Sequence, residues 1–202
     1  MWGESIHIKR ITMKDQNIAI LVVEFQKTWT QDSFFHFLIK NEYTSRNIYE
    51  NSISLLNTAR EHKVNVIQSP FIIDKNDKEI YSKIPFLPKF LGQFKANTWR
   101  AEYTNGIFKN SDYEVKGRTA FDNTVDSNLI EILKELKTKI IYIMGFTTDH
   151  CVAETIDSLL KFGYEVILIK DASATFKNKV QLKTEDKYNT ITVNELISKI
   201  KE

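Results

Sequence analysis

The sequence has 202 residues, which is enough for one substantial domain and short for two. Its 28 basic and 26 acidic side chains give a formal net charge of +2, which offers no electrostatic reason to expect nucleic acid or a membrane surface as a partner. A single cysteine cannot form an internal disulfide, and no apolar run of about 18 residues is present to span a membrane. The N-terminal stretch 1–15 lacks the apolar core of a signal peptide, so we expect a cytoplasmic protein.

Apolar runs without polar alternation predict buried strands of a parallel sheet. In chain order these runs are 18–25, 64–70, 140–146 and 164–172. Apolar residues spaced for one helix face occur in 47–63, 127–137 and 151–163, and 190–200 has the pattern of a short strand that enters a helix. Residues 71–115 lack clean periods, and we expect an excursion of loops and short elements there. Strands that alternate with helices predict one domain over 1–202, with a three-layer α/β/α fold and a doubly wound, mostly parallel, Rossmann-like sheet.

Local signals indicate where three helices begin or end. Asp126 or Ser127 is the expected N-cap of the helix over 127–137. Gly163 suits a left-handed helix stop. Thr192 and Glu195 have the spacing of a capping box at the start of the last helix.

Ligands of such sheets bind outside the carboxyl ends of the strands, where loops meet helix N-termini. The polar residues at these ends are Glu24, Gln26, the stretch 147–151 and Asp171. Cys151 would lie in the first turn of a helix, where the helix dipole and free N–H groups favour a thiolate and could bind an oxyanion. The alternative is that Cys151 is a small buried hydrophobic residue. We expect Asp171 to end its strand structurally by hydrogen-bonding the loop backbone.

Two charged residues could act on this thiol. Glu24 ends the expected central strand, where burial of a carboxylate is costly without a partner or a task. It is either a structural acid at a loop entrance or a general base that collects the thiol proton. Lys116 lies in the turn-containing segment 115–124 and is either an ordinary surface lysine or, if the fold brings it beside Glu24 and Cys151, a member of the site.

The sequence resembles the isochorismatase-like cysteine hydrolases in three blocks, in order, between about 17 and 197. AILVVEFQKTW resembles the family's first strand, and VKGRTAFDNTVDSNLIEIL resembles its lysine segment. GFTTDHCVAETIDSLLKFGYEVILIKDASAT resembles its cysteine elbow with the following helix and strand. The last block is the most specific of the three.

The resemblance implies a catalytic triad of Glu24, Lys116 and Cys151. It also implies a cis peptide bond between Phe146 and Thr147, and an oxyanion hole made by the N–H groups of Thr147 and Cys151. The implied reaction is hydrolysis of a C–N bond in a small amide, carbamoyl or ureide substrate, through a thioester on the cysteine.

Glu24 departs from the family pattern, in which the acid is normally an aspartate. One extra methylene moves the carboxylate by about 1 Å, and a misplacement of that size can lower a rate by on the order of 10²-fold. One alternative is therefore a weakened or non-catalytic binding or assembly module. Another is cleavage of a vinyl ether, as in isochorismatase itself.

The expected substrate-binding residues come from three segments: Phe25, Gln26 and Trp29 after the acid, Trp99 (with Arg100 and Tyr103 nearby) in an aromatic stretch, and Arg118, Phe121 and His150 near the lysine and the cysteine. Arg118 could recognise a substrate carboxylate and Phe121 could pack on a ring. His150 is a pocket or surface residue, because adjacent side chains on a helix point about 100° apart. The alternative for the aromatic residues is packing of the loop against the body or against a second subunit.

We expect no metal and no cofactor. Nicotinamidases of this superfamily carry a metal site built on an Asp-x-His segment, but the corresponding stretch 69–86 holds no histidine. The four histidines of the chain show no ligand spacing: His7, His36, His62 and His150. The expected partner is a small-molecule substrate. The resemblance also implies a homo-oligomer, and the apolar stretch 34–40 either is buried at its interface or packs on its own domain as an amphipathic helix.

Overall fold

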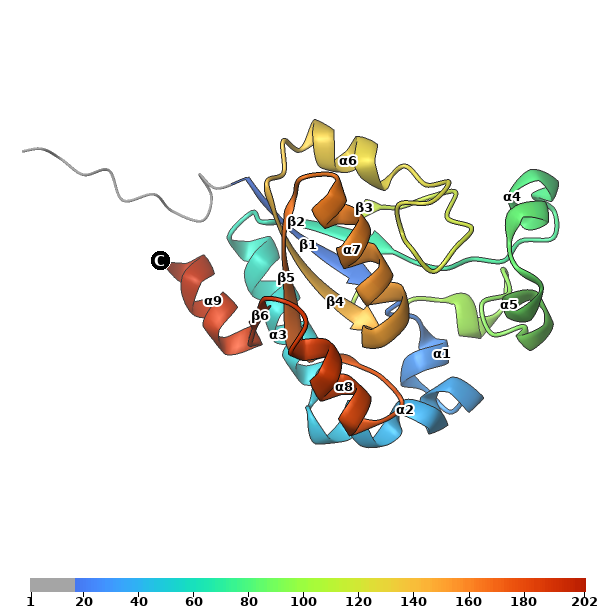
Figure 1. Ribbon diagram of the computed structural model, residues 1–202, viewed down its shortest axis with the longest axis horizontal. Helices are drawn as coiled ribbons and strands as arrows, with labels where there is room; N and C mark the ends of the chain where they lie inside the picture. Colours follow the sequence, from blue (N-terminus) through green and yellow to red (C-terminus); the bar gives the residue numbers. More distant parts are fainter. Residues whose placement is uncertain (1–16) are drawn as a thin grey trace, which may run out of the picture.

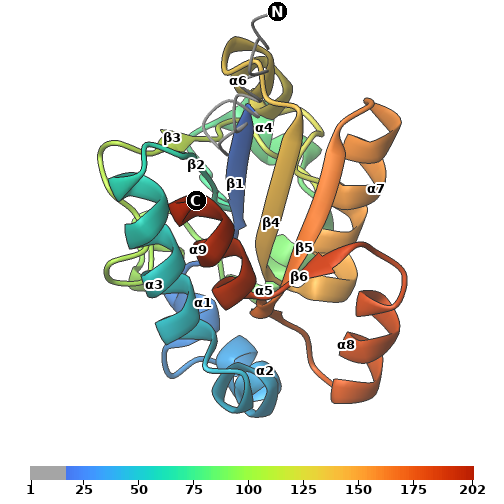
Figure 2. The ribbon, with the colours of Figure 1, turned by 90° about the vertical axis from the view of Figure 1, so that its left-hand side faces the viewer.

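The computed structural model describes residues 17–202, so the stretch 1–16 lies outside the described residues, with His7 and the whole segment 1–15 on which the absence of a signal peptide is predicted. Within 17–202, six parallel strands form one sheet in the order β3-β2-β1-β4-β5-β6 (Figure 1, Figure 2). The strands are β1 (Ile18–Val23), β2 (Asn65–Ser69), β3 (Tyr113–Glu114), β4 (Ile140–Phe146), β5 (Glu165–Ala174) and β6 (Thr190–Ile191). The predicted parallel sheet is confirmed, with β1 in its interior.

Helices and short helical turns connect these strands. They are α1 (Lys27–Thr30), α2 (Phe34–Ser45), α3 (Ile48–Glu61), α4 (Lys78–Lys83), α5 (Phe86–Leu91), the 3₁₀ turn η2 (Trp99–Ala101), α6 (Leu129–Glu135), the π-helical turn η3 (Thr148–Val152), α7 (Ala153–Lys161), α8 (Asn178–Glu185) and α9 (Val193–Lys201). The helices predicted over 47–63, 127–137 and 151–163 correspond to α3, to α6 and to η3 with α7. No helix within the described residues is long and apolar enough to cross a membrane.

Side chains of β1 alternate between two hydrophobic layers. Every second residue from Ile18 packs with α3 and α9, and the residues between them pack with α6 and α7. All the residues of β1 are at most 4% exposed, as expected for a strand that is covered on both faces. Figure 2 shows α3 and α9 on one side of the strands and α7 on the other. The predicted three-layer α/β/α arrangement is therefore confirmed.

Two local predictions at the ends of elements are confirmed. Thr192 and Glu195 form a capping box at the start of α9, and Gly163 follows α7 with a φ of +88°. The carboxylate of Asp171 accepts the N–H of Val193 at 2.8 Å, so this acid has a structural role at the first turn of α9. It does not end its strand as predicted, because β5 continues to Ala174.

The predicted N-cap of α6 is wrong by one or two residues, because Asn128 occupies that position. Asp126 and Ser127 bond the preceding loop, and the hydroxyl of Ser127 also accepts the N–H of Leu129, the first residue of α6, at 3.3 Å. The carboxylate of Asp126 accepts the hydroxyl of Thr119 at 2.7 Å, and the hydroxyl of Ser127 donates to the carbonyl of Asn123 at 2.5 Å. Both side chains are therefore engaged before the helix begins.

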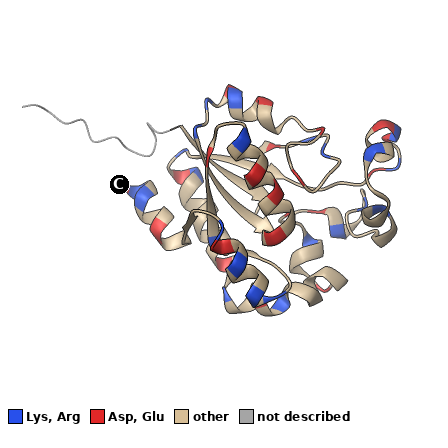
Figure 3. Ribbon diagram, viewed as in Figure 1, with Lys and Arg blue, Asp and Glu red and all other residues tan. Residues whose placement is uncertain are grey.

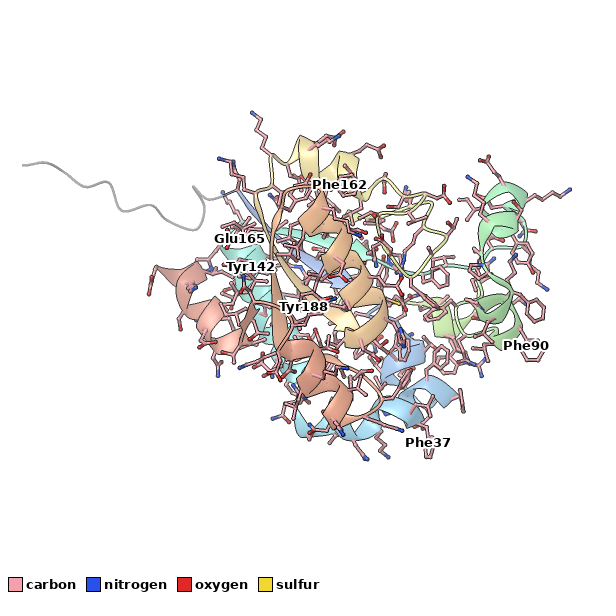
Figure 4. All side chains as sticks on the ribbon, in the orientation of Figure 1. Phe37, Phe90, Tyr142, Phe162, Glu165 and Tyr188 are labelled. Carbon is pink, nitrogen blue, oxygen red and sulfur yellow. The ribbon has the colours of Figure 1, made fainter. Side chains whose placement is uncertain are left out.

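The segment 71–115 contains α4, α5 and η2 between loops, and Figure 1 shows α4 and α5 at the edge of the molecule, away from the sheet. The stretch 34–40 lies in α2, where Ile39 is buried and several apolar residues are exposed. Figure 4 shows Phe37 of α2 and Phe90 of α5 pointing outward. The homo-oligomer remains a prediction.

Candidate active site

The carboxyl ends of β1 and β4 lie side by side. The two strands pair in parallel with Val23 opposite Gly145. Gly145 has a φ of +126°, and a Cβ there would lie 2.0 Å from the carbonyl oxygen of Val23, so only glycine permits this approach. The two strand ends therefore deliver Glu24 and the turn with Cys151 to the same edge of the sheet.

Cys151 lies in η3, the single π-helical turn between β4 and α7. The peptide bond between Phe146 and Thr147 is cis. The N–H groups of His150 and Val152 both donate to the carbonyl of Thr147, at 3.1 and 3.2 Å. Cys151 is 5% exposed, so this closed turn holds the sulfur at the inner side of the sheet edge.

Glu24 forms a buried ion pair with Arg118. Nη2 of Arg118 lies 2.5 Å from Oε1 of Glu24, and both side chains are 2% exposed. The indole Nε1 of Trp29 donates to the second carboxylate oxygen at 3.3 Å. Glu24 leaves β1 with a φ of +52°, which is uncommon for a residue other than glycine. Each carboxylate oxygen thus has a donor, as a buried charge requires.

The guanidinium of Arg118 also contacts three backbone carbonyls and one aromatic ring. Nε donates to the carbonyl of Ala120 at 2.9 Å, Nη2 donates to that of Phe121 at 2.8 Å, and Nη1 makes a longer contact of 3.4 Å with that of Ser69. The guanidinium carbon also lies 5.0 Å from the ring centre of Phe71. These contacts occupy the group and place it beside the acid, which differs from the predicted position at a substrate carboxylate.

Lys116 does not lie beside Glu24 as predicted. Its side chain is exposed, and its N–H donates to Oδ1 of Asn128 at 2.8 Å. Gly117 follows with a φ of +85°, and the chain turns there into the interior, where Arg118 is 3% exposed. The prediction that Lys116 stands against the acid is therefore wrong, and the basic group in that position is Arg118.

Burial, Glu24 and Arg118 together determine the acidity of the Cys151 thiol. Burial raises its pKa well above the ordinary value, the charge and hydrogen bond of Glu24 raise it further, and Arg118 opposes them. We therefore expect a neutral thiol in the resting protein at neutral pH, in place of the thiolate predicted from the sequence, so that the proton must leave as the sulfur attacks.

The raised pKa of Cys151 predicts a loss of stability in alkali. An unfolded chain releases a thiol proton near pH 8.5, whereas the folded protein retains it to higher pH. Above about pH 8.5 the unfolded state therefore binds fewer protons, and the free energy of unfolding should fall by up to about 1.4 kcal/mol per pH unit. Denaturant titrations between pH 7 and 10 measure this fall. Cys151→Ala should lack this part of it, and equal slopes for the two proteins would contradict the raised pKa.

Phe25 and Gln26 are buried in the wall beside the acid. The ring of Phe25 lies 4.8 Å from that of Phe146. The side chain of Gln26 donates to the carbonyls of Phe71 and Ala101, at 3.1 and 2.8 Å, and accepts the N–H of Phe71 at 2.9 Å. These bonds hold two parts of the segment 71–115 against the start of α1. Both polar atoms of the Gln26 side chain are used in them, so Gln26 has a structural role beside the acid.

The other predicted pocket residues lie nearer the surface. Phe121 and His150 are both exposed, with ring centres 6.4 Å apart, and they flank the segments that hold Arg118 and Cys151. Trp99 is also exposed and lies under the guanidinium of Arg100 at 5.0 Å. Their contact with substrate stays a prediction.

Among residues 17–202, no three His, Cys, Asp or Glu side chains are arranged to hold a metal ion. Nδ1 of His36 and of His62 lie against main-chain carbonyls at 2.8 and 3.0 Å. His150 is exposed at the surface. The described histidines therefore do not converge.

Sequence reasoning missed three buried polar residues that bond one another next to the site: Ser69, Asn123 and Thr155. Each is at most 1% exposed. One signal was available for Thr155, which lies four residues after Cys151 on the helix face that carries the apolar residues of α7. Ser69 lies at the end of the predicted strand 64–70, and Asn123 lies in a polar stretch that resembles an ordinary loop.

Fold and site together define an α/β protein that carries a buried thiol, a carboxylate and a guanidinium at the carboxyl ends of its central strands. The model of the isochorismatase domain matches residues 18–188. The chain belongs to the isochorismatase family.

Three relatives are informative. YrdC, an uncharacterised isochorismatase family protein of Bacillus subtilis (strain 168), is 33% identical over 91 residues, or 45% of this chain, and the match spans about half of that curated relative (48%). The crystal structure of a cysteine hydrolase from Pseudomonas syringae pv. phaseolicola 1448A aligns with a TM-score of 0.76 at 19% identity, over 92% of this chain and 93% of that one. N-carbamoylsarcosine amidase from Thermoplasma acidophilum aligns with a TM-score of 0.69 at 17% identity, over 88% and 97%. At these identities the two solved structures show the fold alone.

Proposed function

We propose that this protein is a cysteine hydrolase that cleaves the C–N bond of a small amide, carbamoyl or ureide substrate. The observation that carries the proposal is the single cysteine, buried in a turn at a helix start, with a buried Glu24–Arg118 ion pair acting on its thiol. Two proteins of the same fold, named as a cysteine hydrolase and an N-carbamoylsarcosine amidase, support this class of reaction.

The first half of the reaction forms the thioester. Glu24 accepts the thiol proton as Sγ of Cys151 attacks the substrate carbonyl, because the raised pKa keeps the proton on sulfur until then. A C–S bond forms and the carbonyl oxygen becomes an oxyanion, which the N–H groups of Thr147 and Cys151 would hold. Glu24 then returns the proton to the leaving nitrogen, the C–N bond breaks, and ammonia or an amine departs.

The second half restores the enzyme. Glu24 takes a proton from water, the resulting hydroxide attacks the thioester carbonyl, and the C–S bond breaks as the sulfur regains a proton. Arg118 remains cationic throughout, since a guanidinium is not deprotonated in proteins. It holds Glu24 in place and offsets the negative charge that passes between the acid, the sulfur and the oxyanion.

We expect the substrate to be small and weakly charged. Cys151 and Glu24 are nearly inaccessible, and the donors of Arg118 are taken by protein oxygens, which leaves this guanidinium no free pair of donors for a carboxylate. Figure 3 shows basic and acidic residues interspersed along the helices, and the formal net charge is only +2, so we expect no strong field of one sign to steer a highly charged ligand. Recognition then depends on the carbonyl and its immediate substituents.

Replacement of Cys151 by alanine tests the proposal. The wild-type protein should release ammonia from at least one member of a panel of small amides, carbamoyl amino acids and ureides. Cys151→Ala should lower that rate by roughly 10⁴-fold or more, because it removes the nucleophile. Intact-mass measurement of quenched wild-type reactions should also detect the acyl group on the chain's one cysteine.

Full activity of Cys151→Ala would overturn the thioester mechanism. Release of pyruvate from a vinyl ether by both proteins would instead point to chemistry that needs the acid alone. A melting temperature of the variant close to that of the wild type is the control for folding.

A further inference from the structure

Three buried polar side chains connect the two halves of the candidate active site. The hydroxyl of Ser69 donates to Oδ1 of Asn123. The N–H and the side-chain Nδ2 of Asn123 donate to Oγ1 of Thr155, at 3.0 and 2.7 Å. Thr155 in turn donates to the carbonyl of Cys151 at 2.6 Å. A continuous path of hydrogen bonds thus leads from the end of β2 to the turn that carries the thiol.

The Glu24–Arg118 pair stands at the other end of this path. The carbonyl of Ser69 accepts the N–H of Glu24 at 3.0 Å and receives the longer contact from Nη1 of Arg118. The carbonyl of Phe121 accepts both Nη2 of Arg118, at 2.8 Å, and Nδ2 of Asn123, at 3.1 Å. Asn123 is therefore linked to Arg118 through the carbonyl of Phe121 and to the backbone of Glu24 through Ser69. Thr155 of α7 links it to the turn with Cys151.

The path is buried, neutral and fully bonded. Ser69 is 1% exposed, and Asn123 and Thr155 are 0% exposed. These residues come from three separate segments: the end of β2, the loop before α6, and α7. A buried polar group that loses its partner costs about 1–3 kcal/mol, so the bonds hold the three segments at a fixed spacing.

We propose that Asn123, acting through Thr155, is a positioning residue that sets the distance between Cys151 and the Glu24–Arg118 pair. The effect of Asn123 on turnover rests on the proposed function. Its effect on the environment of the Cys151 thiol does not. Neither side chain takes part in bond making. A displacement of about 1 Å between reacting groups is enough to lower a rate by on the order of 10²-fold.

Thr155→Val and Thr155→Ser form a matched pair for the test. Valine keeps the shape of threonine and removes the hydroxyl, whereas serine keeps the hydroxyl. Thr155→Val should lower kcat by about 10²-fold with KM within about threefold, because geometry and not substrate affinity is lost. Thr155→Ser should stay within about threefold of the wild type in both constants.

Alkylation of Cys151 by iodoacetamide supplies a measurement that needs no substrate. In Thr155→Val the rise of the alkylation rate with pH should move to lower pH, because the thiol moves away from Glu24 and gains water. Asn123→Ala should produce the same two changes. In the double variant the effects of Thr155→Val and Asn123→Ala should be less than additive, because both substitutions interrupt the same path of hydrogen bonds.

A purely structural role would lower the melting temperature of Thr155→Val and leave kcat and the alkylation profile as in Thr155→Ser, which would overturn the proposal. If Thr155→Val does not fold, Ser69→Ala cuts the path at its other end and is judged by the same two measurements. If turnover turns out not to depend on Cys151, the proposed function fails, and the alkylation profiles still decide whether the path positions the thiol.

Discussion

Replacing Arg118 with alanine is expected to lower kcat/KM by about 10³-fold and to destabilise the fold by roughly 3–5 kcal/mol. The variant leaves the carboxylate of Glu24 buried without its cation, and both side chains are only 2% exposed in the ion pair. It also removes the hydrogen bonds of the guanidinium to the carbonyls of Ala120 and Phe121. Ammonia release and urea denaturation measure the two effects.

Lys116→Ala is the matched control for Arg118→Ala. Its side chain is exposed, so activity should stay within about twofold of the wild type and stability should not change. The activity and stability of Arg118→Lys should lie between those of Arg118→Ala and Lys116→Ala. The lysine ammonium keeps the charge but cannot make the same set of contacts in one plane. A loss in Lys116→Ala as large as in Arg118→Ala would return the catalytic role to the lysine that the resemblance implies.

Glu24 and Arg118 depart together from the aspartate and the lysine that the resemblance implies. An acid longer by one methylene would be misplaced against a lysine placed for aspartate. Here the cation enters two residues later, after the turn at Gly117, and its Nη2 lies 2.5 Å from Oε1 of Glu24. The guanidinium is thus placed for a glutamate, so the longer acid is not by itself a sign of an impaired site.

Most of the fold follows from local patterns. The strands β1, β4 and β5 are marked by continuous apolar runs, and the helices α3, α7 and α9 by apolar residues on one helix face, so that their type and order are predictable. The edge strand β3 has two residues and is defined only by its pairing with β2. The other edge strand, β6, is equally short, and with α9 it matches the short strand and helix predicted over 190–200. Of the helix over Asn178–Glu185, only Gln181 is buried, so its sequence offers no apolar stripe to detect.

The site is less predictable than the fold, because tertiary contacts decide which residues it contains. Glu24 and Cys151 are visible at strand ends, and the structure places both at one sheet edge. The choice between Lys116 and Arg118 depends on a single left-handed residue, Gly117, which sends one side chain outward and the other inward. Asn123 has no feature in the sequence that distinguishes it from a loop residue, and only its burial shows its place.

Replacing Glu24 with glutamine is expected to change turnover and thiol reactivity in opposite directions. Turnover should fall by about 10²–10⁴-fold, because glutamine cannot accept the thiol proton. Alkylation of Cys151 at pH 7.5 should become several-fold faster, since the charge of Glu24 raises the pKa of the thiol and Arg118, which lowers it, stays in place. The pH dependence of iodoacetamide alkylation, followed by mass, measures the second effect on the chain's one cysteine.

These opposite signs separate two mechanisms. If the acid worked by stabilising a resting thiolate, its removal would slow alkylation and turnover together. If the acid takes the proton only as the sulfur attacks, its removal leaves a more acidic thiol that has lost its proton acceptor. The wild type and Glu24→Gln are compared by the pH at which the alkylation rate rises and not by the absolute rate, because the absolute rate also depends on access to the buried sulfur. A rise at higher pH in Glu24→Gln would show that Glu24 lowers the pKa of Cys151, and the concerted transfer proposed here would then be wrong.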